Sequence, residues 1–159
     1  MGSIARPNND TAKEGTDRNE PQRLLVPLMV ARELLIVTAL VEMPIGLMLL
    51  LSPGLVVPFL LGTSLGAPAA LVVARIAGAA LFSLGGACWL ARDDGPSRAR
   101  RGLVAAILLY NCTAAAVLAN AASGVRLVGV LLWPAVALHT GLAVWCIASL
   151  RRRPVKASG

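Results

Sequence analysis

An acidic residue lies inside one of the most apolar stretches of this sequence. The segment "TALVEMPIGL", residues 38–47, carries Glu42 with no other charged residue in it. A basic residue, Arg75, lies in a second such stretch, "ALVVARIAGAAL" (70–81). A charge at the centre of a bilayer costs about 2.5–3.5 kcal/mol on insertion scales, so each of these residues needs a partner or a function. Glu42 and Arg75 are therefore the first candidates for chemistry.

Counting along the two stretches predicts that Glu42 and Arg75 form an intramembrane ion pair. At about 1.5 Å per residue, Glu42 lies roughly 24 Å from Val26, and Arg75 lies about 24 Å from Ala91, the ends expected on the same side of the membrane. Such a pair would fix helix pairing and register, which is the structural interpretation. The functional interpretation is a carboxylate that handles a proton or a ligand in an outward-facing cavity. The pattern favours the structural one.

Further polar side chains in the third and fourth apolar stretches define a candidate polar cavity. Its members are Tyr110, Asn111, Asn120 and His139. Helical rise puts Asn120 about 27 Å from Gly102, close to the height of Glu42, and puts His139 at a depth comparable with Tyr110. A lone His in a bundle is typical of hydrogen-bonded packing. As a haem ligand it would need a second axial ligand from a homodimer or a Met, and proton relay or quinone contact stays open.

Arg32 and Glu33 mark the cytoplasmic entry of the first helix, where long side chains reach back to the interface. Because consecutive helical residues point to different sides, we expect no pairing between these two. Glu33 is also about half a turn away from Glu42, so the two carboxylates do not form a catalytic dyad. The sequence thus gives no catalytic residue and favours a protein that is not an enzyme.

The three cysteines, Cys88, Cys112 and Cys146, are widely separated and are expected to pack as small apolar residues. No zinc motif, phosphate-binding lysine loop or dinucleotide fingerprint occurs, and the "GTSLG" at 62–66 follows no strand. We therefore predict no metal site and no cofactor, with quinone or haem as the alternative.

The elements that carry these residues are membrane helices. The chain is 57% hydrophobic and 14% charged, with a mean hydropathy of +0.72, whereas soluble domains are about a quarter charged. Four apolar stretches, about 26–51, 67–91, 102–123 and 127–150, are long enough to cross a bilayer. Short connections predict an all-α, up-down bundle of four transmembrane helices. Residues 1–23 are expected to be a disordered tail, and 151–159 a basic tail.

The basic residues alternate between the connections in a way that predicts orientation. The tail before the first helix, the 92–101 connection and the C-terminal end each hold four Lys or Arg, whereas the other two connections hold only Arg126. This positive-inside pattern predicts that both termini are cytoplasmic. It favours contact with anionic lipid headgroups, not nucleic acid, as the role of the net charge of +7.

Small residues and prolines indicate how the helices meet. Gly78 and Gly85 recur at helical spacing and are expected to let a neighbouring backbone approach closely. The uncharged "SPGLVVPFLLGTSLGAP" (52–68) is expected to be an interfacial or partly re-entrant outer segment. Trp133 and Pro134 are expected several residues inside the fourth helix, with a kink there.

The layout of "SPGLVVPFLLG" after the first helix and "ARIAGAALFSLGGACWLAR" in the second resembles small bacterial four-helix membrane proteins of the DoxX-like type, over roughly residues 25–150. The resemblance implies an integral protein of the bacterial inner membrane and carries over no catalytic residue. Our leading hypothesis is a non-enzymatic accessory or assembly subunit, alone, as a homo-oligomer or in a larger complex. The alternatives are a quinone- or haem-associated redox subunit and a small proton-coupled transporter.

Overall fold

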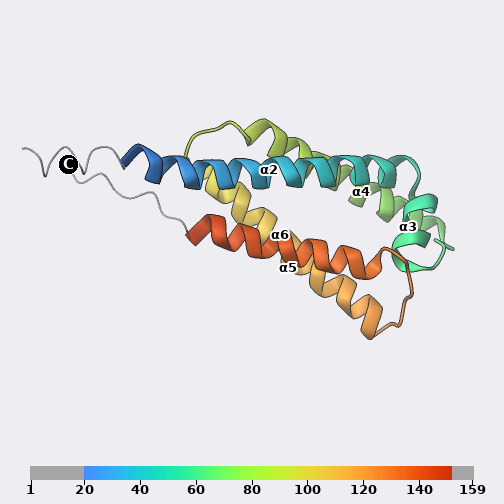
Figure 1. Cartoon of the computed structure of the whole chain (residues 1–159). Coiled ribbons are helices and arrows are strands. Elements are labelled where there is room, and N and C mark those ends of the chain that lie inside the picture. Colours follow the sequence, from blue (N-terminus) through green and yellow to red (C-terminus); the bar gives the residue numbers. More distant parts are fainter. Residues whose placement is uncertain (1–19, 152–159) are drawn as a thin grey trace, which may run out of the picture.

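A computed structural model describes residues 20–151 of the chain, and the side chains from Met29 onward. All the regular secondary structure in this part of the chain is helical, as predicted (Figure 1). The helices are α2 (Glu20–Leu51), α3 (Pro53–Leu61), α4 (Pro68–Ala91), α5 (Arg98–Ser123) and α6 (Leu132–Arg151). Residues 1–19 and 152–159, where the two tails were predicted, lie outside the described residues.

Four of these helices are long and apolar enough to cross a membrane, which confirms the predicted class of protein. The candidate spans are Met29–Leu51, Pro68–Ala91, Arg98–Ser123 and Leu132–Arg151. At about 1.5 Å per residue, each reaches about 30 Å or more, the thickness of a bilayer core. The nine-residue α3 is too short to cross and connects α2 to α4.

The spanning helices pack as two antiparallel pairs. α2 packs most extensively on α4, and α5 on α6, while α2 also contacts α6 (Figure 1). α4 and α5 follow one another in the chain but pack little on each other. All four helices contribute to one buried apolar cluster, made of Leu34, Leu35, Ala39, Cys88, Val104, Ile107, Leu142 and Cys146.

Glycines bring α2 and α4 into backbone contact, as the small residues of α4 predict. A Cβ atom added at Gly78 would lie 2.7 Å from the carbonyl oxygen of Gly46, and one added at Gly46 would lie 2.8 Å from that of Gly78. A Cβ atom at Gly85 would lie 2.9 Å from the backbone nitrogen of Met43. Without side chains at these positions the two backbones touch, and dispersion and Cα–H contacts replace the hydrophobic effect that is absent in lipid.

Three predicted boundaries are corrected. α2 begins at Glu20, so residues 20–23 are helical and not part of a disordered tail. The fourth helix begins at Leu132 instead of 127, which places Pro134 in its first turn, where a missing N–H breaks no helical bond. No internal kink is therefore needed at Pro134. The chain between α5 and α6 is correspondingly a longer connection, 124–131, than the three residues left between the predicted stretches 102–123 and 127–150.

This longer connection packs against α3 at the end of the bundle opposite the described chain ends (Figure 1). The Leu131 N–H donates to the Phe59 carbonyl oxygen at 3.0 Å, and Gly129 lies directly against the backbone of Leu60. Gly62 ends α3 with a left-handed φ of 73°, a conformation that glycine adopts without strain. The 124–131 connection and the last turn of α3 thus cover part of each other's backbone.

Candidate functional site

The buried carboxyl of Glu42 faces α5, where it accepts a hydrogen bond from the phenol of Tyr110. The Tyr110 hydroxyl donates to Glu42 Oε2 at 3.2 Å, and Glu42 is 2% exposed. On the α4 side, a Cβ atom at Gly85 would lie 3.3 Å from the Glu42 Cβ, so Gly85 is its neighbour there. Glu42 is therefore enclosed between α4 and α5, away from the surface that would face lipid.

The predicted ion pair between Glu42 and Arg75 is wrong. Among the side chains of residues 29–151 no ion pair or hydrogen bond involves Arg75, which is exposed on α4. Gly78 contacts the backbone of Leu49 and Leu50 near the C-terminal end of α2. Arg75 precedes Gly78 by about one turn in the antiparallel α4, so it lies level with that end of α2. By helical rise this is about 15 Å beyond Glu42.

The error lies in the register between the two helices. The calculation took Val26 and Ala91 to be level, but Arg32 contacts Asp93 through a 2.9 Å hydrogen bond. Gly85 lies against the backbone of Met43, so Ala91, six residues further along α4, is level with about residue 36 or 37 of α2, about 15 Å from Val26. A count along one helix gives height only relative to that helix, so the offset between two helices has to come from their packing.

A second hydrogen-bonded pair joins α5 to α6 next to Tyr110. Asn111 is fully buried, donates from Nδ2 to the Ile107 carbonyl oxygen at 2.9 Å, and turns Oδ1 toward His139 Nδ1 at 2.8 Å. Because Oδ1 only accepts, Nδ1 carries the proton, and a neutral His139 keeps its lone pair on Nε2. The rings of Tyr110 and His139 meet edge to face, with centroids 5.5 Å apart.

The structure therefore brings together Glu42, Tyr110, Asn111 and His139 from three helices, which we call the polar cluster. The predicted common depth of Tyr110 and His139 is confirmed by this contact. Asn120 is not a member: it lies nine residues beyond Asn111, about 14 Å along α5, and its side chain is exposed. Whether the cluster lines a cavity stays a prediction.

Thr38 is a residue that sequence reasoning did not select as part of the site. It lies one turn before Glu42 on the same face of α2 and is 0% exposed. Its hydroxyl oxygen and Glu42 Oε1 are both buried without a hydrogen-bond partner in the described structure. Nearly all buried polar atoms in proteins have a partner, so two open ones a single turn apart are unusual. The i, i+4 spacing of a hydroxyl and a carboxyl was the available signal.

Nothing in the described part of the chain forms a metal centre or a dithiol. Residues 20–151 contain no group of three or more His, Cys, Asp or Glu side chains that could hold a metal ion. All three cysteines are free, with Cys88 and Cys146 buried in the apolar cluster and Cys112 exposed. The expectation of apolar packing thus fits the first two, while the thiol of Cys112 lies on the outer surface of α5.

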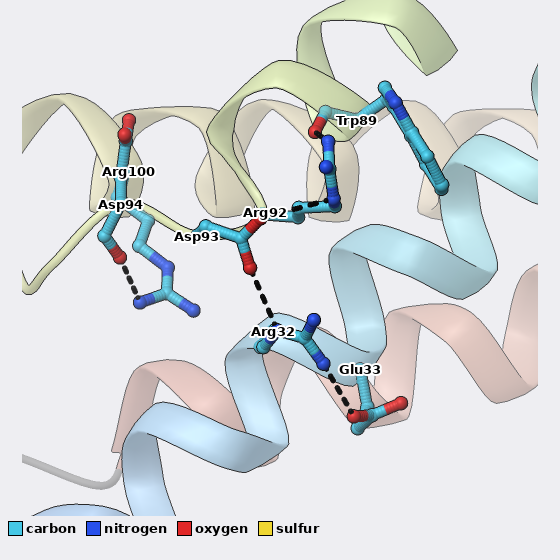
Figure 2. A network of polar contacts seen from close by, with 7 residues as sticks. All are labelled: Arg32, Glu33, Trp89, Arg92, Asp93, Asp94 and Arg100. Carbon is cyan, nitrogen blue, oxygen red and sulfur yellow. Dashed lines mark hydrogen bonds and ion pairs between the residues drawn. The ribbon is translucent and has the colours of Figure 1, made fainter.

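A second polar network closes the opposite side of the apolar cluster, at the entry predicted for Arg32 and Glu33 (Figure 2). Arg32 lies between two carboxylates: its Nε donates to Asp93 at 2.9 Å and its Nη1 lies 3.5 Å from Glu33 Oε1. The expectation that Arg32 and Glu33 do not pair is therefore wrong, because the long arginine side chain bends across its own helix. The Arg32 guanidinium holds the pKa of the Asp93 carboxyl below its ordinary value.

Other arginines in this network hold the connection between α4 and α5 in place. Arg92 pairs with Asp93 at 3.2 Å, and its guanidinium lies 4.1 Å from the ring centroid of Trp89 (Figure 2). Arg100 is buried and donates to the Asp94 carbonyl oxygen at 2.6 Å, while its backbone N–H is capped by the Ser97 hydroxyl. The network ties the start of the first span to this connection.

No family model matches the chain, and comparison with curated proteins and with solved structures finds no match either.

What the site can do follows from its chemistry. The polar cluster combines a carboxyl, a phenol and an imidazole, all groups that exchange protons, and among residues 29–151 no Lys or Arg side chain pairs with Glu42. It is thus better suited to proton or ligand binding than to register control by opposite charges.

Proposed function

We propose that this chain is a small multi-pass membrane protein that handles protons at Glu42, in the manner of a proton-coupled transporter. The observation that supports this is a carboxyl that is 2% exposed, accepts one hydrogen bond and has no Lys or Arg partner among the side chains of residues 29–151. A buried carboxylate without a counter-charge is costly in a membrane, and taking up a proton removes the charge. The structural interpretation of Glu42 required Arg75 opposite it and has lost that support.

The neighbours of Glu42 suit a proton relay. Tyr110 donates to Glu42 and touches the ring of His139, and Asn111 fixes the orientation of that ring. An imidazole can accept a proton on one ring nitrogen and release one from the other, and a phenol can accept and release a proton at its single oxygen. Because these residues come from α2, α5 and α6, a small shift between the two helix pairs would break or remake the relay.

Infrared titration of the purified full-length protein in detergent micelles tests this proposal without knowledge of a substrate. The carbonyl stretch of a protonated carboxyl is to be followed against pH in wild type, Glu42→Gln and Glu33→Gln. We expect a band that disappears reversibly with rising pH, is missing in Glu42→Gln and survives in Glu33→Gln, because Glu33 is exposed. A Glu42 band that never changes while the protein stays folded would refute proton handling.

A second candidate, an accessory or assembly subunit of a larger membrane complex, is favoured by the position of Arg75. Its exposed guanidinium lies within a spanning helix and has no partner among the side chains of residues 29–151. An acidic side chain of another membrane protein at the same depth would compensate it. Arg75→Met is then expected to reduce the size of the complex extracted in mild detergent. The control Arg98→Met, at the first residue of α5, is expected to leave that size unchanged. Equal sizes would favour a lipid phosphate as the partner of Arg75.

We further propose that the end of the bundle that carries the network around Arg32 faces the cytoplasm of a bacterial inner membrane and contacts anionic lipids. Arg92, Arg98, Arg100 and Arg101 lie in or beside the connection at this end, while the opposite connection carries Arg126. Lys and Arg are retained on the cytoplasmic side during insertion. A reporter that works only in the cytoplasm is expected to be active when fused after Gly159, whereas a reporter that works only in the periplasm is expected to be inactive there. The opposite result would contradict the proposed orientation.

A further inference from the structure

Two buried atoms of the site around Glu42, Glu42 Oε1 and the Thr38 hydroxyl oxygen, can each still accept a hydrogen bond. Glu42 Oε1 is an acceptor when ionised, the Thr38 oxygen has free lone pairs, and the one donor directed at Glu42, the Tyr110 hydroxyl, is already used by Oε2. Thr38 and Glu42 Oε1 are both buried, so bulk water does not satisfy them. Glu42 Oε1 therefore needs a donor, and a ligand that supplies N–H or O–H groups can also use the Thr38 oxygen as an acceptor, while the Thr38 O–H stays available to donate.

The charge of the site further limits which ligands can bind next to Glu42. The titratable groups around Glu42 are Tyr110 on α5 and Cys88 on α4, with His139 of α6 beside Tyr110. A phenol, a thiol and a neutral imidazole carry no positive charge, so an ionised Glu42 leaves the site with one uncompensated negative charge. One proton or one monovalent cation neutralises it, and the two exclude each other.

We propose that Glu42 and Thr38 bind the ammonium group of a small protonated amine, which exchanges with the proton of Glu42. An ammonium offers three N–H donors, enough for Glu42 Oε1 and the Thr38 oxygen, while the Tyr110 hydroxyl keeps its hydrogen bond to Glu42 Oε2. The exchange is balanced: the amine cation binds, the O–H bond of the Glu42 carboxyl breaks, and one proton leaves to water. A bare metal ion is less suited, since the described residues supply no cluster of ligands.

This inference rests on the proposed proton handling by Glu42 and names the species that competes with the proton. Thr38 then has a binding role, because its hydroxyl oxygen accepts one N–H of the bound ammonium. Loss of a hydrogen bond to a charged group is expected to weaken binding by about tenfold or more.

The test uses the same infrared band in full-length protein at a fixed pH where Glu42 is protonated. Methylammonium chloride is titrated against tetramethylammonium chloride, which has equal charge but no N–H group. We expect methylammonium alone to reduce the band in wild type, and Thr38→Val to require about tenfold more of it. The matched control Thr140→Val, on the exposed face of α6 where the hydroxyl bonds to its own helix, is expected to behave as wild type.

The outcomes separate the two proposals. A band that titrates with pH but ignores methylammonium, or that responds equally to both cations, overturns amine binding and leaves proton handling intact. Equal affinity in wild type and Thr38→Val overturns the role of Thr38, and with it the site as described. A band that does not titrate with pH refutes both proposals. Thr38→Val removes an unpartnered buried hydroxyl, so we expect the variant to fold and to unfold no more easily than wild type.

Discussion

The contact between Gly46 and Gly78 gives the sharpest prediction about how α2 and α4 are held together. In Gly46→Ala the new Cβ atom would lie 2.8 Å from the Gly78 carbonyl oxygen and 3.0 Å from the Leu81 carbonyl carbon, both backbone atoms. Ordinary contact begins near 3.4 Å, and helical backbone cannot turn aside as a side chain can. The two helices must therefore separate by about 0.5 Å or more over their most extensive interface.

Such overpacking costs about 1–3 kcal/mol, which lowers the equilibrium constant for folding by roughly 5- to 150-fold. Gly86→Ala in α4 is the matched control, because a Cβ atom at Gly86 meets nothing within 4 Å. There the substitution only reduces the freedom of the unfolded chain, and we expect a gain of up to about 1 kcal/mol. Gly46→Ala is thus predicted to lower the free energy of unfolding, and Gly86→Ala to leave it unchanged or raise it.

Reversible unfolding in mixed micelles with increasing sodium dodecyl sulfate, followed by tryptophan fluorescence, measures both free energies. Gly46→Ala is expected to unfold at lower denaturant content than wild type, and Gly86→Ala at equal or higher content. Gly78→Ala should match Gly46→Ala, because a Cβ atom there lies 2.7 Å from the Gly46 carbonyl oxygen. Wild-type stability of Gly46→Ala would refute the close backbone contact on which the register of the bundle depends.

The remaining predictions concern the two polar networks. Tyr110→Phe removes the donor to the buried carboxyl and should lower the free energy of unfolding by about 1–3 kcal/mol in the same assay; an unchanged value would contradict that hydrogen bond. Asn111→Leu and His139→Leu, measured singly and together, should show a coupling energy of about 0.6 kcal/mol and at most about 1.7, whereas simple additivity would mean that the two side chains do not interact. The pKa of Asp93 is lowered in the folded protein by Arg32, so their pairing contributes stability above the unfolded-state pKa near 3.8 and is lost as the pH falls through the lower folded value. The protection of the backbone amides after α4 from hydrogen exchange, relative to the intrinsic rate at the same pH, should accordingly fall in strong acid in wild type and be low at every pH in Asp93→Asn. Identical protection in both proteins would exclude the link.

Part of the candidate site could be predicted from the sequence because depth within one helix follows from counting residues. Tyr110 and His139 were expected at comparable depth and do meet, and Asn111 shares their layer. Glu42 was selected because a carboxyl in an apolar stretch is energetically conspicuous. Thr38 was not selected, since a threonine in a membrane helix usually bonds to its own backbone and only the structure shows that this one does not.

Four apolar helices of membrane-spanning length can be predicted from the residue composition, because insertion depends on the composition of each segment alone. The spacing of the glycines in α4 also predicts that they face a neighbouring backbone. Which residue lies opposite Glu42 follows only from how the helices pack, since a slip of one residue between helices changes height by about 1.5 Å and direction by about 100°. The contacts of Gly78 and Asp93 with α2 set that offset, and they place Gly85 and Tyr110, instead of Arg75, beside the buried carboxyl.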